Sequence, residues 1–300
     1  MTSAISPLAQ RFLATMNGID SRLERVQRQI STGRKISSAS DDPAKTSQIL
    51  DYRADIERLA QIGTNLGQVK GEAESADKAI SSAITVIERA RVIAVQGANA
   101  TMGASERGTM AVEVQGLLER LVVIADTTFN GRRLFSGDSD QAAPFTLDPA
   151  SATGVSAYAG SAATRRIEHP SGGTFRVALS GDEIFNNPSG NSVFQAVNQL
   201  RTALLANNQA AIASAVQALR DAGYHLNAGL SFYGSVESTV SAAISTTQEQ
   251  ILTCRTALGS LEDTDITEAI LELTEVQTQR EAALASRAQL PRTTLFDYLG

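Results

Sequence analysis

Apolar residues near the start of the chain recur at alternating spacings of four and three positions, the seven-residue repeat of a helix that packs against another helix. This repeat runs through Ile5, Ala9, Phe12, Met16, Ile19, Leu23, Val26 and Ile30. The same register returns near the end of the chain, with two charged interruptions, at Ile266, Ala269, Leu273, Val276, Arg280, Ala283, Arg287 and Leu290. Each stripe needs a partner surface, and neither has one nearby in the sequence.

These two stripes allow two kinds of packing that periodicity cannot separate. The first and last helices either pair with each other inside one molecule or pack on copies of themselves in neighbouring molecules. In the second case they form an assembly seam, which we expect to be carried by Ile5, Phe12, Met16, Ile19, Leu23, Val26, Ile30, Ile266, Leu273, Val276, Leu284 and Leu290.

Local signals divide the N-terminal half of the chain into further helices. The first helix is expected to end near Gly33, because glycine commonly terminates helices. Asp42 is placed to cap the next helix, and Pro43 suits its first position, where a missing N–H costs nothing. An apolar stripe continues this second helix towards Gly97, and another helix is expected over 105–128.

The middle of the chain has a different texture. From Ser136 to Gly190, glycine, serine, proline and isolated aromatic residues replace the helical period. The segments 164–168 and 174–179 flank a Pro-Ser-Gly-Gly turn and are expected to pair as a hairpin. Because insertions of this kind usually return the chain close to where it left the main body, we expect a small surface domain that folding and assembly do not need.

The helical spacing of apolar residues returns after the insertion, over 192–206, 209–227 and 235–260. A closing helix is expected to begin at Asp265, whose carboxylate can cap it. The fold class is therefore mainly α: an elongated helical hairpin or coiled-coil bundle formed by the N- and C-terminal segments, with a small β-rich insertion at the far end. The expected domains are a terminal coiled-coil core (1–44 and 262–300), a helical bundle (45–135 and 190–261) and a small β-rich surface domain (136–189).

Composition and charge narrow the classes of function. The 300-residue chain has no Trp and only 5% aromatic residues, so few large side chains are available to fill a core. This favours long, thin helical packing over a compact globule. The net charge of −6 is spread without a basic run, which argues against nucleic-acid and membrane partners. Cys254 is the single cysteine, so no internal disulfide can form. The N-terminus lacks the pattern of a cleavable signal peptide, and no apolar run is long enough to span a membrane.

The chain offers little material for chemistry. His169 and His225 are the only histidines, so a histidine-based metal site or a nucleophile–histidine arrangement is not expected. Asp41 and Asp42 are interpreted as turn and cap residues rather than a paired acid and base. The acidic cluster Glu262, Asp263 and Asp265 precedes a helix N-terminus, where negative charge is favoured, and is not interpreted as a calcium site. We expect no catalytic, cofactor-binding or metal-binding residues and no cofactor.

Three separate segments carry a resemblance to a known family. Residues 30–36 (ISTGRKI), followed by 40–43 (SDDP), resemble the N-terminal signature of the bacterial flagellin family. Residues 261–269 (LEDTDITEA) resemble its C-terminal signature, and 127–131 (TTFNG) are similar to the point where its helical part gives way to variable β domains. The resemblance covers about residues 1–135 and 190–300, and leaves the insertion undefined.

The resemblance implies a structural, self-assembling subunit of an extracellular helical tube that serves swimming motility. Terminal helices of neighbouring copies would form the coiled-coil core of a homo-oligomer, which would contact other axial proteins of the flagellum, including a hook-associated protein and flagellin. It also implies type III export by the flagellar apparatus, with an export chaperone and without a cleavable signal peptide.

Two kinds of family member remain open. Asp41-Asp42-Pro43, Pro144-Phe145 and the segments 133–137, 182–185 and 295–299 are similar to subunits at the junction between hook and filament. Phe129-Asn130-Gly131 and Leu290-Pro291 favour instead a subunit of the filament. A third hypothesis needs no resemblance: a cytoplasmic helical-bundle adaptor that uses its heptads only internally. We favour the junction subunit.

Overall fold

A computed structural model describes residues 7–38, 40–139, 142–186 and 192–288. The chain divides into two compact units, a terminal unit (Met1–Arg58 with Gln250–Gly300) and a central unit (Leu59–Glu249). Its elements, in order, are α1 (Pro7–Thr32), α2 (Pro43–Gly97), α3 (Ala104–Ala125), β1 (Thr128–Phe129), β2 (Arg132–Arg133), β3 (Arg166–Glu168), β4 (Thr174–Arg176), α4 (Gly181–Phe185), α5 (Val193–Leu205), α6 (Gln209–Glu262) and α7 (Ile266–Ala288).

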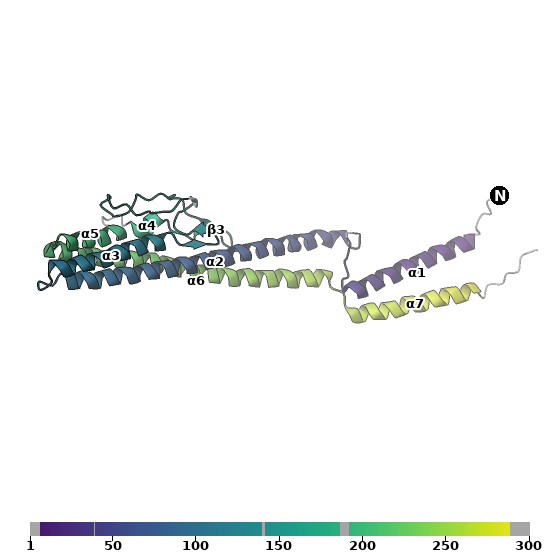
Figure 1. Cartoon of the computed structure of the whole chain (residues 1–300). Helices are drawn as coiled ribbons and strands as arrows, with labels where there is room; N and C mark the ends of the chain where they lie inside the picture. The colour runs from purple at the N-terminus through teal and green to yellow at the C-terminus, as the bar shows by residue number, and fades with distance from the viewer. Residues whose placement is uncertain (1–6, 39, 140–141, 187–191, 289–300) are drawn as a thin grey trace, which may run out of the picture. The chain divides into compact units, whose positions relative to one another are not determined.

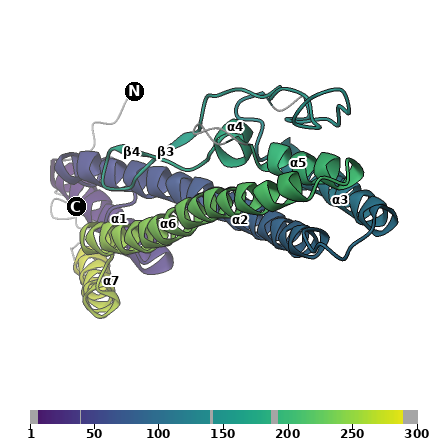
Figure 2. The same cartoon turned by 90° about the vertical axis from the view of Figure 1, so that its left-hand side faces the viewer.

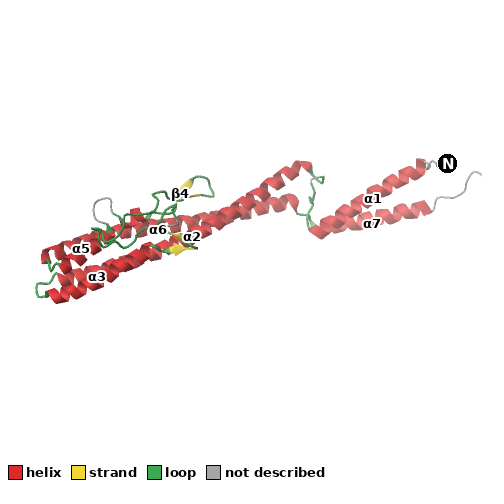
Figure 3. Cartoon of the chain, turned by 45° about the horizontal axis from the view of Figure 1, so that its top comes forward, coloured by secondary structure: helices red, strands yellow, loops and turns green. Residues whose placement is uncertain are grey.

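The mainly α fold class is confirmed, and the described strands are short segments among the loops of the central unit (Figure 3). The predicted hairpin is also confirmed, because β3 and β4 pair antiparallel with Ile167 opposite Phe175. Its turn closes through the backbone N–H of His169, which donates to the carbonyl oxygen of Gly173. Gly172 and Gly173 both have positive φ angles, of 87° and 85°, which explains why glycines occupy this turn.

The predicted helix ends agree with the structure where a specific residue sets them. Gly33 follows α1 with φ of 69°, a conformation that glycine adopts without strain. Asp42 caps α2, since its Oδ1 accepts the backbone N–H groups of Ala44 and Lys45 at 3.1 and 3.2 Å.

One expected boundary is wrong, because α6 is a single helix of 54 residues with no break between 227 and 235. The apolar stripe continues through this stretch at helical spacing, and Leu226, Tyr233, Val236 and Val240 are all buried. Burial of this stripe offsets the low helix propensity of the glycines there.

In the central unit, α3, α5 and the parts of α2 and α6 that belong to it lie side by side, with the loops of the insertion along one side (Figures 1 and 2). Their facing sides form one apolar cluster in which Leu66, Ile80, Leu121 and Leu200 are fully buried. None of the described helices is both long and apolar enough to cross a membrane.

A buried arginine joins two turns of the central unit. Arg107 Nε donates to the carbonyl oxygen of Gly97 at 2.9 Å, and Nη2 donates to that of Asn99 at 3.1 Å. Its Nη1 donates to Asn207 Oδ1 in the turn between α5 and α6. The guanidinium therefore fixes the α2–α3 turn against the α5–α6 turn.

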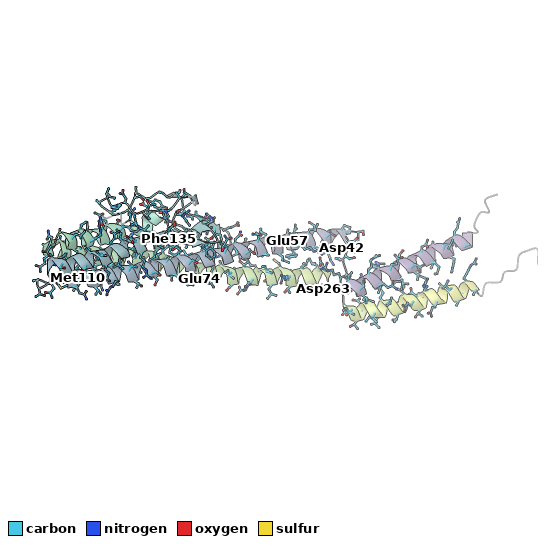
Figure 4. All side chains as sticks on the ribbon, viewed as in Figure 1. Asp42, Glu57, Glu74, Met110, Phe135 and Asp263 are labelled. Atoms are coloured by element: carbon cyan, nitrogen blue, oxygen red, sulfur yellow. The ribbon has the colours of Figure 1, made fainter. Side chains whose placement is uncertain are left out.

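The insertion shares a core with the helices of the central unit, which the sequence did not indicate. Phe145 and Phe185 belong to it, yet both are buried and both contact Phe194 of α5, with ring centroids 4.8 and 5.3 Å apart. Phe135, labelled in Figure 4, lies edge-on to Phe185 at 5.7 Å. These four rings, which we call the phenylalanine cluster, place the insertion in the same core as the helices. Turn-rich composition masked this, because the aromatic residues stand singly among turn residues and carry no hydrophobic period.

Candidate assembly surface of the terminal helices

In the terminal unit, α1 and α7 lie side by side and run antiparallel (Figures 1 and 3). Val26 of α1 and Val276 of α7 are completely buried in this single chain. Phe12, Met16, Ile19, Leu23, Ile30 and Leu273, which we expected to carry the seam, are half-buried. Pairing of the two helices inside one molecule, one of the two alternatives from the sequence, is thus what the structure contains.

Polar contacts set the register of this pair. Asp20 pairs with Arg280 at 3.1 Å, and Arg22 pairs with Glu272 at 3.2 Å. All four side chains are substantially exposed, so each pair contributes at most about 1 kcal/mol. The ion pairs therefore fix the direction and alignment of α1 against α7 more than they stabilise the pair.

Two further predicted seam residues are more exposed than the half-buried ones. Ile266 and Leu284 are about half exposed, at 53% and 49%, while Ile5 and Leu290 lie outside the described residues. Exposed with them are three apolar residues that the heptad pattern did not select, Leu13, Ile270 and Leu271.

We call Leu13, Ile266, Ile270, Leu271 and Leu284 the outward apolar set. Ile266 and Ile270 are one helical turn apart on α7, whereas Leu271 is rotated from Ile270 by one residue, so α7 presents apolar side chains on more than one side. Burying a large apolar side chain gains about 1.5–3 kcal/mol, a gain that this set does not realise in the single chain. For Leu13, Ile270 and Leu284, the sequence signal was an apolar residue directly after a position of the heptad stripe.

The strength of the α1–α7 contact can be tested at its buried centre. We expect Val276→Ala to speed hydrogen exchange of α1 amides roughly tenfold, because it removes about two buried methylene equivalents of ~0.8 kcal/mol each. Hydrogen exchange followed by mass spectrometry measures this. Leu284→Ala is the matched control and should change exchange in α1 less than about twofold, since its side chain is exposed in the chain. Equal effects of the two substitutions would contradict the observed pairing.

The two signature segments from the ends of the chain meet beside this helix pair. The backbone N–H of Lys35 donates to the carbonyl oxygen of Glu262 at 2.5 Å, and that of Thr264 donates to Gly33 at 3.0 Å. Asp263, labelled in Figure 4, lies between these bonds where α6 has ended. The resemblance had singled out both segments without indicating that they touch.

Glu262 differs from the expectation for an acidic residue near a helix N-terminus. It is the last residue of α6, only 3% exposed, and its carboxylate pairs with Arg53 and, at 3.5 Å, with Arg34. Asp265 does cap the next helix, because its Oδ1 accepts the backbone N–H groups of Thr267 and Glu268 at 2.8 and 3.3 Å. The acidic cluster is thus divided between a buried ion pair and a helix cap.

Asp41 has the structural role predicted for it. Its Oδ2 accepts the backbone N–H groups of Ser37 and Ser38 at 3.0 and 2.8 Å, closing the turn before α2. These hydrogen bonds lower the pKa of Asp41, because they favour the ionised carboxylate. In the described part of the chain, no three His, Cys, Asp or Glu side chains are placed to hold a metal ion.

Comparison with known proteins finds two regions of one family in this chain. The model of the bacterial flagellin N-terminal helical region matches residues 7–140, and that of the C-terminal helical region matches residues 216–299. Flagellar hook-associated protein 3 of Escherichia coli is 26% identical over 166 residues, which are 55% of this chain and 50% of that protein. Polar flagellin C of Vibrio parahaemolyticus is 33% identical over 144 residues, which are 47% of this chain and 36% of that protein.

These alignments span half the length or less of the two curated relatives. A solved structure of a protein described as flagellar hook-associated, from Vibrio parahaemolyticus, matches 75% of this chain and 100% of its own. Its TM-score is 0.67 at 20% sequence identity, which establishes a shared fold.

Proposed function

Because the chain belongs to the bacterial flagellin family, we propose that it is a structural subunit of the flagellum located at the hook–filament junction. Members of this family are structural flagellar proteins, not enzymes. The observation that carries the proposal is the outward apolar set, which leaves the α1–α7 pair with surface to bury against neighbours.

Assembly of several copies follows from the geometry of that pair. The helices already bury Val26 and Val276 against each other, so a second contact must use other faces. The outward apolar set lies on both helices and on more than one side of α7, and can therefore contact more than one neighbour. This suits a homo-oligomeric helical tube, in which each subunit is surrounded by copies.

Within the flagellum, the junction is supported by the match to hook-associated protein 3 and by the fold shared with another hook-associated protein. At that position the chain would contact a hook-associated protein and flagellin. The 33% identity to a polar flagellin supports the alternative, a filament subunit. Export by the flagellar type III apparatus without a cleaved signal peptide, with the help of a chaperone, belongs to both versions of the proposal.

The three-part division of the chain also remains part of the proposal. Residues 1–44 with 262–300 would form the assembling core, 45–135 with 190–261 the surrounding bundle, and 136–189 the surface domain. Residues 136–189 are not packed separately from the bundle, because the phenylalanine cluster joins them to α5.

Antibody labelling of intact flagella tests the location. Antibodies raised against the exposed β3–β4 hairpin should label a short zone where the filament begins. Deletion of the gene should then leave hooks without attached filaments, which phase-contrast and electron microscopy detect. Label along the whole filament would replace the junction proposal by the filament alternative, and label confined to the cytoplasm would exclude both.

A further inference from the structure

A small polar cavity lies at the base of the β3–β4 hairpin. Its volume is about 40 Å³, and its wall is formed by α2, the turn of β1 and β2, the segments that flank the hairpin, and Tyr233 of α6. Every residue of the wall belongs to the central unit. A water molecule needs about 10–15 Å³ of such space, so the cavity has room for about three waters.

Two hydrogen-bond donors in this wall have no acceptor among the described residues. Tyr233 is 2% exposed, and its hydroxyl oxygen accepts the backbone N–H of Leu179 at 3.2 Å, but none of the described residues accepts the hydroxyl hydrogen. Burial raises the pKa of Tyr233 to about 12, so the hydroxyl keeps this hydrogen at neutral pH. Arg165 pairs with Glu72 through Nη2, whereas its buried Nε meets no acceptor in the part of the chain that is described. Buried donors are rarely left without an acceptor, so we expect one inside the cavity.

The charges around the cavity indicate what kind of acceptor it holds. The charged residues in or beside the wall are three arginines and three acids: Arg132, Arg133, Arg165, Glu72, Asp126 and Asp138. Arg165 pairs with Glu72, and Arg133 pairs with Asp126 at 2.5 Å. An anion would therefore enter a site without excess positive charge to offset its loss of hydration. A neutral molecule that accepts from the two donors and also donates to carboxylates suits this wall better, and water does both.

We propose that the cavity is a hydration site, in which a few waters accept hydrogen bonds from Tyr233 and Arg165, donate to Glu72, and so attach the base of the hairpin to α2 and α6. Arg165 precedes β3, and its carbonyl oxygen accepts the N–H of Val177, which follows β4, at 3.1 Å. The waters therefore hold the two ends of the hairpin together with the helices. This attachment is polar and separate from the phenylalanine cluster, which joins the insertion to α5 through apolar contacts.

Nuclear magnetic resonance of the full-length monomer tests this through two signals, the Nε–H of Arg165 and the backbone N–H of Leu179. Both should show nuclear Overhauser cross-peaks to water, with the sign that bound rather than bulk water gives. In Tyr233→Phe, which removes the hydroxyl and keeps the ring, the Arg165 cross-peak should fall by about half or more, because one of the groups that hold the waters is gone. Replacement of chloride by gluconate, which is too large for the cavity, at constant ionic strength should not shift the Arg165 signal.

Tyr158→Phe is the matched control, because the Tyr158 hydroxyl already donates to the carbonyl oxygen of Phe135 at 2.9 Å and Tyr158 is not part of the wall. It should leave the Arg165 cross-peak at full intensity. A wild-type protein without water cross-peaks would have a dry cavity, and a chloride-dependent shift of the Arg165 signal would reveal an anion site. Either result, or an equal effect of Tyr158→Phe, would overturn the proposal. The first two are measured on the wild type, so they decide the question even if Tyr233→Phe does not fold, and neither bears on the location of the chain in the flagellum.

Discussion

Leu271→Asp and Ile270→Asp are each expected to reduce the amount of the chain in isolated flagella to below about one tenth of the wild type, since a carboxylate in a dry interface costs several kcal/mol. Both residues are exposed in the single chain, 65% and 48%, so the helical content of the purified monomer should not change. Immunoblots of isolated flagella and of the surrounding medium measure where the protein goes, and circular dichroism measures its helicity.

The matched control for these variants is Thr274→Asp, which adds the same charge to another exposed position of α7. It should be incorporated like the wild type, while the two apolar variants accumulate in the medium as unassembled chains. Wild-type incorporation of Leu271→Asp would remove that residue from the assembly surface. If Thr274→Asp were also not incorporated into flagella, any added charge on α7 would prevent assembly. The outward apolar set would then have no special role.

Phe185→Ala and Phe145→Ala should each lower the free energy of unfolding of the central unit by about 3–5 kcal/mol, the usual cost of removing a buried phenyl ring. The reason is the phenylalanine cluster, in which both rings are at most 2% exposed and contact Phe194 of α5. Urea unfolding followed by far-ultraviolet circular dichroism measures the change, because α5 and its neighbours supply most of the signal.

Leu147→Ala is the control within the same insertion, since its side chain is 43% exposed. It should change the free energy of unfolding by less than about 0.5 kcal/mol. If Phe185→Ala were as mild as this control, the insertion would be independent of the helices after all. The sequence-based expectation of a dispensable surface domain would then be supported.

The parts of this fold that the sequence predicted depend on local chemistry. Gly33, Asp42 and Asp265 end or cap helices through their own backbone angles or side chains, and no distant contact is needed to recognise them. The hairpin of β3 and β4 follows from its glycine turn in the same way.

The parts that the sequence did not predict depend on contacts between distant segments. The partners of Glu262 come from residues 34 and 53, and nothing near Glu262 in the sequence distinguishes it from Asp263. The four rings of the phenylalanine cluster are separated by loops that carry no period. For the assembly surface, the heptad pattern identified residues such as Val26 and Val276, which are buried within the single chain, and it passed over Leu13, Ile270 and Leu271.

The contacts between α1 and α7 also determine the order in which the chain can fold. Arg22 meets Glu272 and Gln279 across 250 and 257 positions of sequence, so almost the whole chain must be closed into a loop before this pair forms. The apolar core of the central unit lies entirely between Ile62 and Ala243 and includes contacts over much shorter separations. Because short loops close first, the central unit should fold early and the pairing of the two chain ends last. Kinetically, the ends are then also the first part to open, which leaves them free to exchange partners while the rest of the molecule stays folded.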